Sequence, residues 1–314
     1  MTIAELADRA GPGSGTLLTE IERDAFRASV LDWYDRAGRR FPFRGTTDPY
    51  LVLVSEAILQ QTQVTRGAPA WTSFVERFPI VESLAAASPG DVLRAWRGLG
   101  YNRRAINLQR SARVVVDELG GRFPTDVAGL ERLPGVGPYT ARAIASIAFG
   151  LPVGAVDTNV RRVLGRTVAG EAGAIPGPAL QALADALVSV DRPGDWTAAL
   201  MDLGSTVCRP RAPRCGDCPV RVMCRYEAVG AGADAPNRAA QSTGVPFERS
   251  SRWLRGRILD RLRDAPDQAW TELDGAIGTH DADAVAAALA SMARDGLVEL
   301  AEDGPGRSAR LPTA

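Results

Sequence analysis

All four cysteines of this 314-residue chain lie in one arginine-rich segment, CRPRAPRCGDCPVRVMC. They are Cys208, Cys215, Cys218 and Cys224, with the spacing C-x6-C-x2-C-x5-C. Thiols this close along the chain suit one shared metal centre better than two unstrained disulfides. Four thiolates bind either zinc or a [4Fe–4S] cluster. The segment therefore predicts a metal site, and the four thiolates alone do not decide between zinc and a [4Fe–4S] cluster.

Two acidic residues stand in unlike surroundings that suit different parts of one reaction. Glu56 lies inside the apolar run LVLVSEAIL, where poor solvation should raise its pKa and keep the carboxyl protonated, as a general acid requires. Asp157 directly precedes TNVRRVLGR and is expected to cap a helix, whose free N–H groups favour a carboxylate. Such a pair is typical of glycosidic bond cleavage. The structural alternatives are a plain N-cap for Asp157 and a buried, hydrogen-bonded acid for Glu56.

The stretch LPGVGPYTARAIASIAFG, residues 133–150, predicts a tight hairpin followed by a helix. Gly135 and Gly137 flank Val136, and Pro138 occupies the favoured first helical position. Glycines at this place let backbone N–H groups face outward and hold a phosphate. With the helix before it, the stretch forms a helix-hairpin-helix; the alternative is an ordinary connection between two helices.

Helices are expected to position these side chains, because apolar residues recur at helical spacing over most of the chain. The predicted helices cover residues 16–37, 51–64, 68–78, 81–87, 89–97, 103–119, 127–132 and 140–149. Strand-like alternation is missing before the last quarter, so the bulk is predicted to be all-α. After a stretch rich in Ala, Gly, Pro and Ser, residues 252–266, 269–278 and 281–300 have the pattern of three short helices. A two-stranded turn follows, which completes the outline of a winged helix.

The charges are unevenly distributed although the formal net charge is zero. Arginine is the one charged residue type between Val92 and Val116, and arginines also surround the cysteines. These two zones predict either a local phosphate-binding face or solvated helix surfaces. The chain has no lysine, so no lysine Schiff base can form. No signal peptide or membrane-length apolar run is present, and we expect a soluble, intracellular protein without a membrane partner.

Several motifs in order resemble one family, the helix-hairpin-helix DNA glycosylases with an iron–sulfur cluster, and most closely their adenine-specific, MutY-type branch. Over residues 25–226 they are DPY, SEAILQQTQV, GLGY, LPGVGPYTA, VDTNVRRVL, MDLGSTVC and the four cysteines. The resemblance implies that the cysteines hold a [4Fe–4S] cluster with a structural role. It also matches Glu56 and Asp157 with the catalytic acids of the family.

The resemblance implies roles for further residues. Tyr139 stands near the place where bifunctional relatives have a lysine nucleophile, and Asn159 matches a residue that supports the catalytic Asp. DNA contacts are implied for Arg44 near the flipped base, for Tyr101 as a stacking wedge, and for the trio Gln60, Gln61 and Thr62 on the opposite strand. The family usually has Trp where this chain has Phe43, and an aromatic residue where it has Asn102. Structural alternatives are a helix C-cap for the glutamines and a core position for Tyr101.

The predicted fold is therefore all-α, a two-lobed helix-hairpin-helix glycosylase with an iron–sulfur loop and a small C-terminal winged-helix-like α+β domain. The expected domains are residues 1–43 (N-terminal helices packing with the cluster lobe), 44–150 (six-helix lobe), 151–226 (cluster lobe), 227–249 (linker) and 250–314 (winged-helix-like domain). The last domain does not resemble the Nudix-like domain that recognises 8-oxoguanine in typical adenine glycosylases.

The predicted function is monofunctional excision of adenine mispaired with 8-oxoguanine or guanine, after flipping of the base. The partner is double-stranded DNA containing a mismatch or lesion, and the protein is expected to be a cytoplasmic monomer that associates with the nucleoid. Two alternatives are a glycosylase for thymine or uracil opposite guanine, and a catalytically silent DNA-binding relative.

Overall fold

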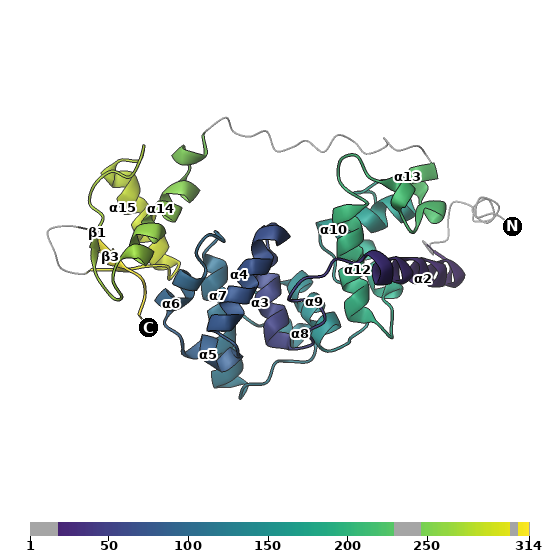
Figure 1. Cartoon of the computed structure of the whole chain (residues 1–314), viewed down its shortest axis with the longest axis horizontal. Helices are drawn as coiled ribbons and strands as arrows, with labels where there is room; N and C mark the ends of the chain where they lie inside the picture. Colours follow the sequence, from purple (N-terminus) through teal and green to yellow (C-terminus); the bar gives the residue numbers. More distant parts are fainter. Residues whose placement is uncertain (1–17, 229–245, 302–306, 314) are drawn as a thin grey trace. The chain divides into compact units, whose positions relative to one another are not determined.

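Capping residues and apolar periodicity explain where the helices of this chain begin and end. The computed structural model describes residues 18–228, 246–301 and 307–313 (Figure 1). Residues 16–17 of the first predicted helix, residues 229–245 of the predicted linker and residues 302–306 of the predicted turn lie outside this range. Within it, helices predominate, which confirms the predicted fold class. No helix of the described residues is long and apolar enough to cross a membrane.

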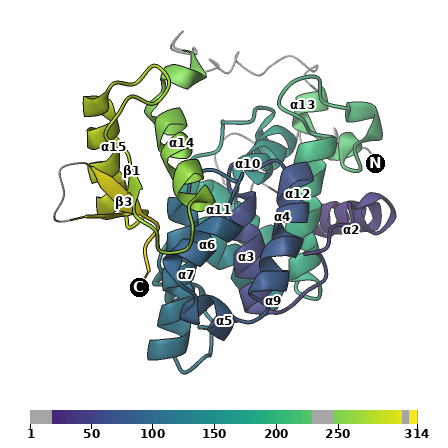
Figure 2. The same ribbon diagram turned by 60° about the vertical axis from the view of Figure 1, so that its left-hand side comes forward.

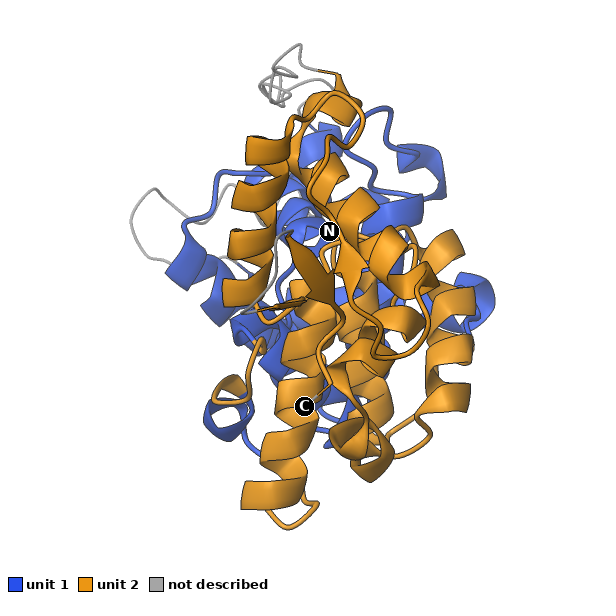
Figure 3. Cartoon of the chain, turned by 90° about the vertical axis from the view of Figure 1, so that its left-hand side faces the viewer, with its two compact units in different colours: residues 1–41, 125–130, 137–237 blue, residues 42–124, 131–136, 238–314 orange. Residues whose placement is uncertain are grey.

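The chain forms two compact units, each built from separate stretches of sequence (Figure 3). One unit comprises residues 1–41, 125–130 and 137–237, and the other comprises residues 42–124, 131–136 and 238–314. The domain boundaries expected from the sequence stay predictions.

The first unit is a helical assembly around one apolar core. Its helices are α2 (Glu20–Ala37), α9 (Pro138–Ala148), α10 (Thr158–Leu164), α11 (Gly177–Leu187), α12 (Pro193–Thr206) and α13 (Arg225–Ala228). The central helix α12 packs against α2, α9 and α10. Phe26 of α2 meets Trp196 of α12 edge to face, with ring centroids 5.8 Å apart, and both side chains are buried. A helix at the centre of the unit fits the apolar residues on several faces of α12.

The second unit contains a helical part that carries Glu56. Its helices are α3 (Pro49–Leu59), α4 (Val64–Arg77), α5 (Val81–Ala86), α6 (Pro89–Ala95) and α7 (Arg103–Arg113), which runs into a π-helical turn at Val114–Glu118. Helix α7 packs against α3, α5 and α6. The short helix α8 (Val127–Glu131) follows in the sequence and belongs, up to Leu130, to the first unit. These helices confirm the predicted ones, except that the predicted helix 51–64 ends at Leu59 and a turn separates it from α4.

The same unit includes a C-terminal module of two helices and a small sheet. It consists of α14 (Ser251–Asp264), α15 (Ala282–Arg294) and the strands β1 (Thr271–Glu272), β2 (Glu299–Leu300) and β3 (Ser308–Arg310). The strands are antiparallel in the order β1-β3-β2, with Thr271 opposite Ala309 and Glu299 opposite Arg310. The predicted pairing of the last two strands is confirmed. Helix α14 packs against α6 (Figure 2).

The helix predicted over residues 269–278 is wrong. Thr271 and Glu272 form β1 instead, and the Leu273 N–H donates to the Arg307 carbonyl at 2.8 Å. The apolar residues Leu273 and Ile277 are buried, as a helical stripe would require, but they lie in the loop after the two-residue strand. Pairing with β3 also covers a sheet edge that would otherwise expose unpaired backbone groups. Tertiary pairing therefore overrides the local helical spacing.

Candidate functional site

Glu56 is a buried acid on an almost wholly apolar helix. Asp48 caps α3 by accepting from the Tyr50 N–H at 2.8 Å, and Pro49 takes the first helical position. The helix is apolar around its circumference, and Glu56 is only 8% exposed within it. A carboxyl group removed from water is costly when ionised, so this setting favours the neutral acid. The placement agrees with the predicted general acid and with the buried structural acid alike.

The polar trio after Glu56 forms the turn between α3 and α4. The Gln60 N–H donates to the Glu56 carbonyl at 3.2 Å and ends the helix, as the structural alternative for this residue requires. Gln61 is exposed and adopts a left-handed backbone with φ of 55°, which is uncommon for a residue with a side chain. Thr62 is buried. Only one of the three therefore presents an exposed amide on a constrained backbone.

Arg104 holds this turn in place, a role that sequence reasoning missed. Its guanidinium donates to carbonyl oxygens of two segments, those of Ala57, Ile58 and Gln60 in one and those of Leu99 and Gly100 in the other. The first set includes carbonyls at the end of α3, which have no partner inside the helix. Burial lowers the pKa of Arg104 to about 10, which leaves it charged at neutral pH. The cation thus joins the Gln61 turn to the loop that carries Tyr101.

Tyr101 is an exposed aromatic residue on a strained loop, and not a core residue. Its side chain is 41% exposed and its φ is 45°, again in the left-handed region. Two arginines lie against the ring, Arg104 at 5.7 Å and Arg252 at 4.6 Å from the ring centroid. Arg44 is partly buried, and the preceding Phe43 packs edge to face on Trp71 at 6.1 Å. Phe43 is thus a core residue.

The hairpin needs its first glycine for steric reasons. Gly135 has φ of 78°, and a Cβ there would lie 2.7 Å from the Asn107 Cβ. Val136 is buried, and its N–H donates to the Leu133 carbonyl at 3.0 Å, so this N–H is not turned outward. Gly137 is exposed and precedes α9, with Pro138 at the first helical position as predicted.

In the first unit, both carboxylate oxygens of Asp157 accept hydrogen bonds. Asp157 caps α10, because its Oδ1 accepts from the Val160 N–H at 2.7 Å. Its Oδ2 accepts from the Asn159 amide Nδ2 at 2.8 Å. The two hydrogen bonds fix the orientation of the carboxylate at the start of α10. The predicted cap is confirmed, and Asn159 lies where the resemblance places a supporting residue.

Arg162 connects this carboxylate to the cysteine segment, a link that sequence reasoning also missed. Its Nη2 donates to Asn159 Oδ1 at 2.8 Å and to the Gly204 carbonyl at 2.6 Å. Its Nε donates to the Cys208 carbonyl at 2.7 Å. Because Arg162 is buried, these bonds fix the orientation of the Asn159 amide and hence of the Asp157 carboxylate. No local signal marks Arg162, since VRRVL has the pattern of any basic helix.

Tyr139 is partly buried on α9, with its hydroxyl 3.6 Å from the Met201 sulfur on α12.

The four cysteines line one small pocket, together with Arg166, Tyr226 and apolar side chains. All four are free thiols. Burial raises the pKa of the Cys208 thiol, and that of Cys218 to about 12, so ligation of a metal centre here must release protons. The Arg166 guanidinium points its Nη1 at Cys208 Sγ, 3.6 Å away, as suits a thiolate.

The geometry of these thiols bears on which occupant they fit. Across residues 18–228, 246–301 and 307–313, no group of three or more His, Cys, Asp or Glu side chains is spaced to hold a single metal ion. A [4Fe–4S] cluster is larger and takes thiolates on separate irons, so its ligands do not have to converge on one ion. Four thiols in one pocket are the ligand type of both kinds of metal centre.

Gly204 of α12 packs directly against Asn159, which belongs to this hydrogen-bond network. A Cβ at Gly204 would lie 2.6 Å from the Asn159 Cβ, a distance that real side chains do not adopt. We expect Gly204→Ala to displace Asn159. The reaction proposed below should then be about 10- to 100-fold slower, since small misplacements of catalytic groups are costly. Single-turnover kinetics measure this effect. The matched control is Gly177→Ala at the start of α11, where a Cβ meets open space. Equal rates in the two variants would contradict the role of the contact.

The sequence is similar to that of known proteins over most of its length. A family model described as HhH-GPD superfamily base excision DNA repair protein matches residues 54–186. An adenine DNA glycosylase from Mycolicibacterium smegmatis is 42% identical over 277 residues, which covers 88% of this chain and 93% of that protein. This chain belongs to the HhH-GPD superfamily. The family resemblance inferred from the ordered motifs is thereby confirmed.

Other members of the superfamily match the helical part of the HhH-GPD chain. The adenine DNA glycosylase of Homo sapiens is 46% identical over 218 residues, covering 65% of this chain and 40% of the human protein. A solved structure of a thermostable thymine-DNA glycosylase is 32% identical with a TM-score of 0.62, covering 66% of this chain and 97% of that one. The fold of this HhH-GPD protein is therefore that of the DNA glycosylases.

Proposed function

We propose that the protein is a monofunctional DNA glycosylase of base excision repair that releases adenine mispaired with 8-oxoguanine or guanine. The observation that carries this proposal is the 42% identity with the Mycolicibacterium smegmatis adenine DNA glycosylase, which extends over 93% of that protein. Double-stranded DNA with such a mismatch is the proposed substrate, and a monomer at the chromosome in the cytoplasm is the proposed working form.

The proposed reaction divides its chemistry between the two acids. Glu56 donates its proton to a ring nitrogen of adenine, which makes the base a better leaving group as the bond to the sugar breaks. Asp157, with Tyr139 beside the sugar, stabilises the positive charge that develops on the sugar ring. Water then adds to the sugar carbon and yields an abasic site. The burial of Glu56 on an apolar helix and the fixed orientation of the Asp157 carboxylate support these two roles.

The proposed reaction ends at the abasic site. A lyase step needs an amine that forms a Schiff base, and the chain has no lysine. We expect borohydride to trap no covalent complex between a protein side chain and the abasic product.

The proposed DNA contacts follow the placement of the candidate residues. Gln61 and Tyr101 are exposed on strained loops, so we assign them the contact with the duplex at the extruded nucleotide. Gln60, Thr62 and Arg44 are less exposed and support these contacts. The hairpin residues Gly135, Val136 and Gly137 are proposed to lie against a DNA phosphate.

We also propose that Cys208, Cys215, Cys218 and Cys224 hold a [4Fe–4S] cluster. When bound, the cluster supplies structural cross-linking of the segment from Cys208 to Cys224. The support comes from the shared pocket, the free thiols and the Arg166 contact to Cys208 Sγ.

Replacing one ligand tests the cluster. We expect wild-type protein, purified without oxygen, to contain four iron and four sulfide per chain, and Cys218→Ser to lose most of both. The loss should lower the melting temperature, because metal binding energy is part of the folding energy. Iron, sulfide and zinc analysis measures the occupant. One zinc per chain with no sulfide would refute the cluster.

One assay tests the proposed activity. The protein is incubated with duplexes that contain adenine opposite 8-oxoguanine, adenine opposite guanine, thymine opposite guanine or uracil opposite guanine, and alkali then reveals abasic sites. Product from the two adenine duplexes is the expected result. Product from the pyrimidine duplexes alone would favour the second candidate, a thymine or uracil mismatch glycosylase, which the 32% identity with the thymine-DNA glycosylase supports. A protein with an intact cluster and no product would be a silent DNA-binding relative.

A further inference from the structure

The C-terminal module, predicted to be a winged helix, consists of two helices and three short strands and has an unusual charge distribution. In helix-turn-helix relatives the second helix usually enters the DNA groove. Here that helix, α15, is rich in alanine, begins with Asp281 and Asp283, and carries Arg294 only in its last turn. An acidic helix start repels phosphate. Helix α14, by contrast, carries five arginines, which are Arg252, Arg255, Arg257, Arg261 and Arg263.

Helix α14 is docked firmly against the helical part of its unit. The buried Arg263 donates to the Leu93 carbonyl at 2.9 Å and to Asn102 Oδ1 at 2.8 Å. Two more arginines of the basic zone pair with acids at the end of α14, Arg97 with Asp264 at 2.6 Å and Arg94 with Asp267 at 2.8 Å. Asn102, which departs from the aromatic residue usual in the family, thus has a docking role here.

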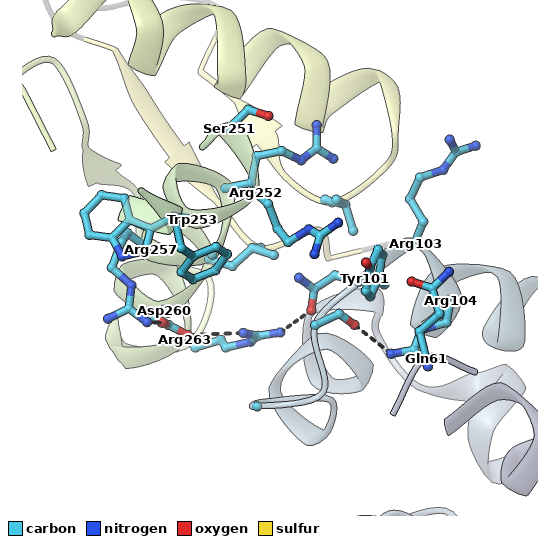
Figure 4. Close-up of a pocket in the computed structure, with 18 of the residues that line it drawn as sticks. Gln61, Tyr101, Arg103, Arg104, Ser251, Arg252, Trp253, Arg257, Asp260 and Arg263 are labelled. Carbon is cyan, nitrogen blue, oxygen red and sulfur yellow. Dashed lines mark hydrogen bonds and ion pairs between the residues drawn. The ribbon is translucent and has the colours of Figure 1, made fainter. Parts of the chain in front are cut away.

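This docking forms a pocket of about 790 Å³ between α14 and the Tyr101 loop (Figure 4). One wall comes from Gln61, Tyr101, Arg103 and Arg104, and the other comes from Ser251, Arg252, Trp253 and Arg257. Arginine is the main charged residue type of the lining, with Asp260 as the acid among the described lining residues. The pocket is therefore positive, and it contains both of the strained residues Gln61 and Tyr101.

Not every arginine in the lining is available to a ligand. Arg255 is bound to Asp295 at 2.6 Å, and Arg257 and Arg263 are paired with Asp260. Arg103 is 67% exposed and lies a long 3.7 Å from Asp295. Among the described residues, Arg252 has the Tyr101 ring as its contact and no acidic partner. Arg103 and Arg252 are thus cations that an entering anion would meet, together with the exposed Arg66, whose Nη1 donates to the Gly98 carbonyl at 3.3 Å.

We propose that this pocket binds phosphate groups of DNA, with Arg252 of α14 and Arg103 of α7 as the principal contacts. The C-terminal module then contacts DNA through its first helix, α14, and not through α15. Arginine on an exposed aromatic ring suits this task, because its planar guanidinium stacks on the ring and still offers donors to a phosphate. The proposal rests on the proposed function in that DNA is the substrate. It extends the contact from Tyr101 and Gln61 to the C-terminal module.

Equilibrium binding as a function of salt tests the proposal. The probe is a duplex with a tetrahydrofuran abasic analogue opposite guanine, which no glycosylase can cleave, and the full-length protein is titrated by fluorescence anisotropy. Each lost phosphate contact should reduce the slope of log Kd against log salt by about 0.9 and weaken binding by roughly five- to tenfold at 0.1 M salt. Arg103→Gln with Arg252→Gln should therefore lower the slope by about 1.8.

A matched control lies on the same helix. Arg261 is exposed on α14 but does not line the pocket, so Arg261→Gln should bind with the wild-type slope. Both altered side chains in the test variant are surface residues, and an unchanged melting curve confirms that the fold is intact. A double variant with wild-type affinity and slope would overturn the proposal, as would an equal loss in Arg261→Gln.

The outcome is separable from that of the proposed function. Adenine release with a wild-type salt slope in the double variant would leave the glycosylase assignment standing and remove the pocket from the DNA interface. A reduced slope in a protein that releases no base would support the pocket and refute the glycosylase.

Discussion

Asp157→Asn is expected to reduce the single-turnover rate of adenine release by about 10²–10³-fold, the loss typical when one electrostatic contact to a developing charge is removed. Asparagine is as good an N-cap as aspartate, so the Val160 N–H keeps its acceptor and α10 stays folded. What disappears is the negative charge that the proposed mechanism places near the sugar cation. The NH2 group of the new asparagine side chain would replace Oδ2 and face the Asn159 Nδ2. Two donors would then face each other unless one of the two amides turns.

The control for this variant is another aspartate with the same local role. Asp281 caps α15 and accepts from the Ala284 N–H at 2.8 Å. Asp281→Asn should leave the rate of adenine release unchanged, because its charge lies in the C-terminal module. DNA affinity is measured for both variants, since a loss of binding would mimic a loss of rate at low enzyme concentration. An Asp157→Asn protein that releases adenine at the wild-type rate would show that the carboxylate is only a helix cap.

Glu56→Gln is expected to lower the same rate by about 10²–10⁴-fold, the range for loss of a general acid. Glutamine has nearly the same shape and carries no charge, so the apolar surroundings of α3 accept it without a cavity. It cannot donate a proton to adenine and remain a stable neutral side chain. The fold and the DNA affinity should therefore be retained while the chemical step is lost.

The matched control is Glu76→Gln on the neighbouring helix α4, where the side chain is exposed. This change should leave rate and melting temperature as in the wild type. If Glu56→Gln instead lowers the melting temperature and keeps its rate per folded molecule, Glu56 is a structural acid and another group must protonate the base.

Features of the site that depend on a few neighbouring residues were predictable. The Asp157 cap, the proline at the start of α9 and the glycine in the hairpin each act within one turn of backbone. Helix positions followed from apolar spacing for the same reason. The spacing of the four cysteines likewise restricts them to one short segment, whatever surrounds it.

Contacts between distant segments were not predictable. Arg104 binds carbonyls more than 40 residues away, and Arg162 reaches Cys208 across 46 positions. Both arginines have the same local sequence pattern as any surface arginine. The prediction of a helix over residues 269–278 was wrong for the same reason, because the strand within them pairs with β3, which lies more than 30 residues later.

The sequence by itself determined the helices, the caps, the family and the residue types available for chemistry, because short-range backbone energetics and spacing decide these. The tertiary structure alone decided which arginines support the backbone and which stay open to DNA. It also decided that α14 lies against Tyr101. Those outcomes depend on which carbonyls and carboxylates packing brings within hydrogen-bond distance, and no local pattern encodes that distance.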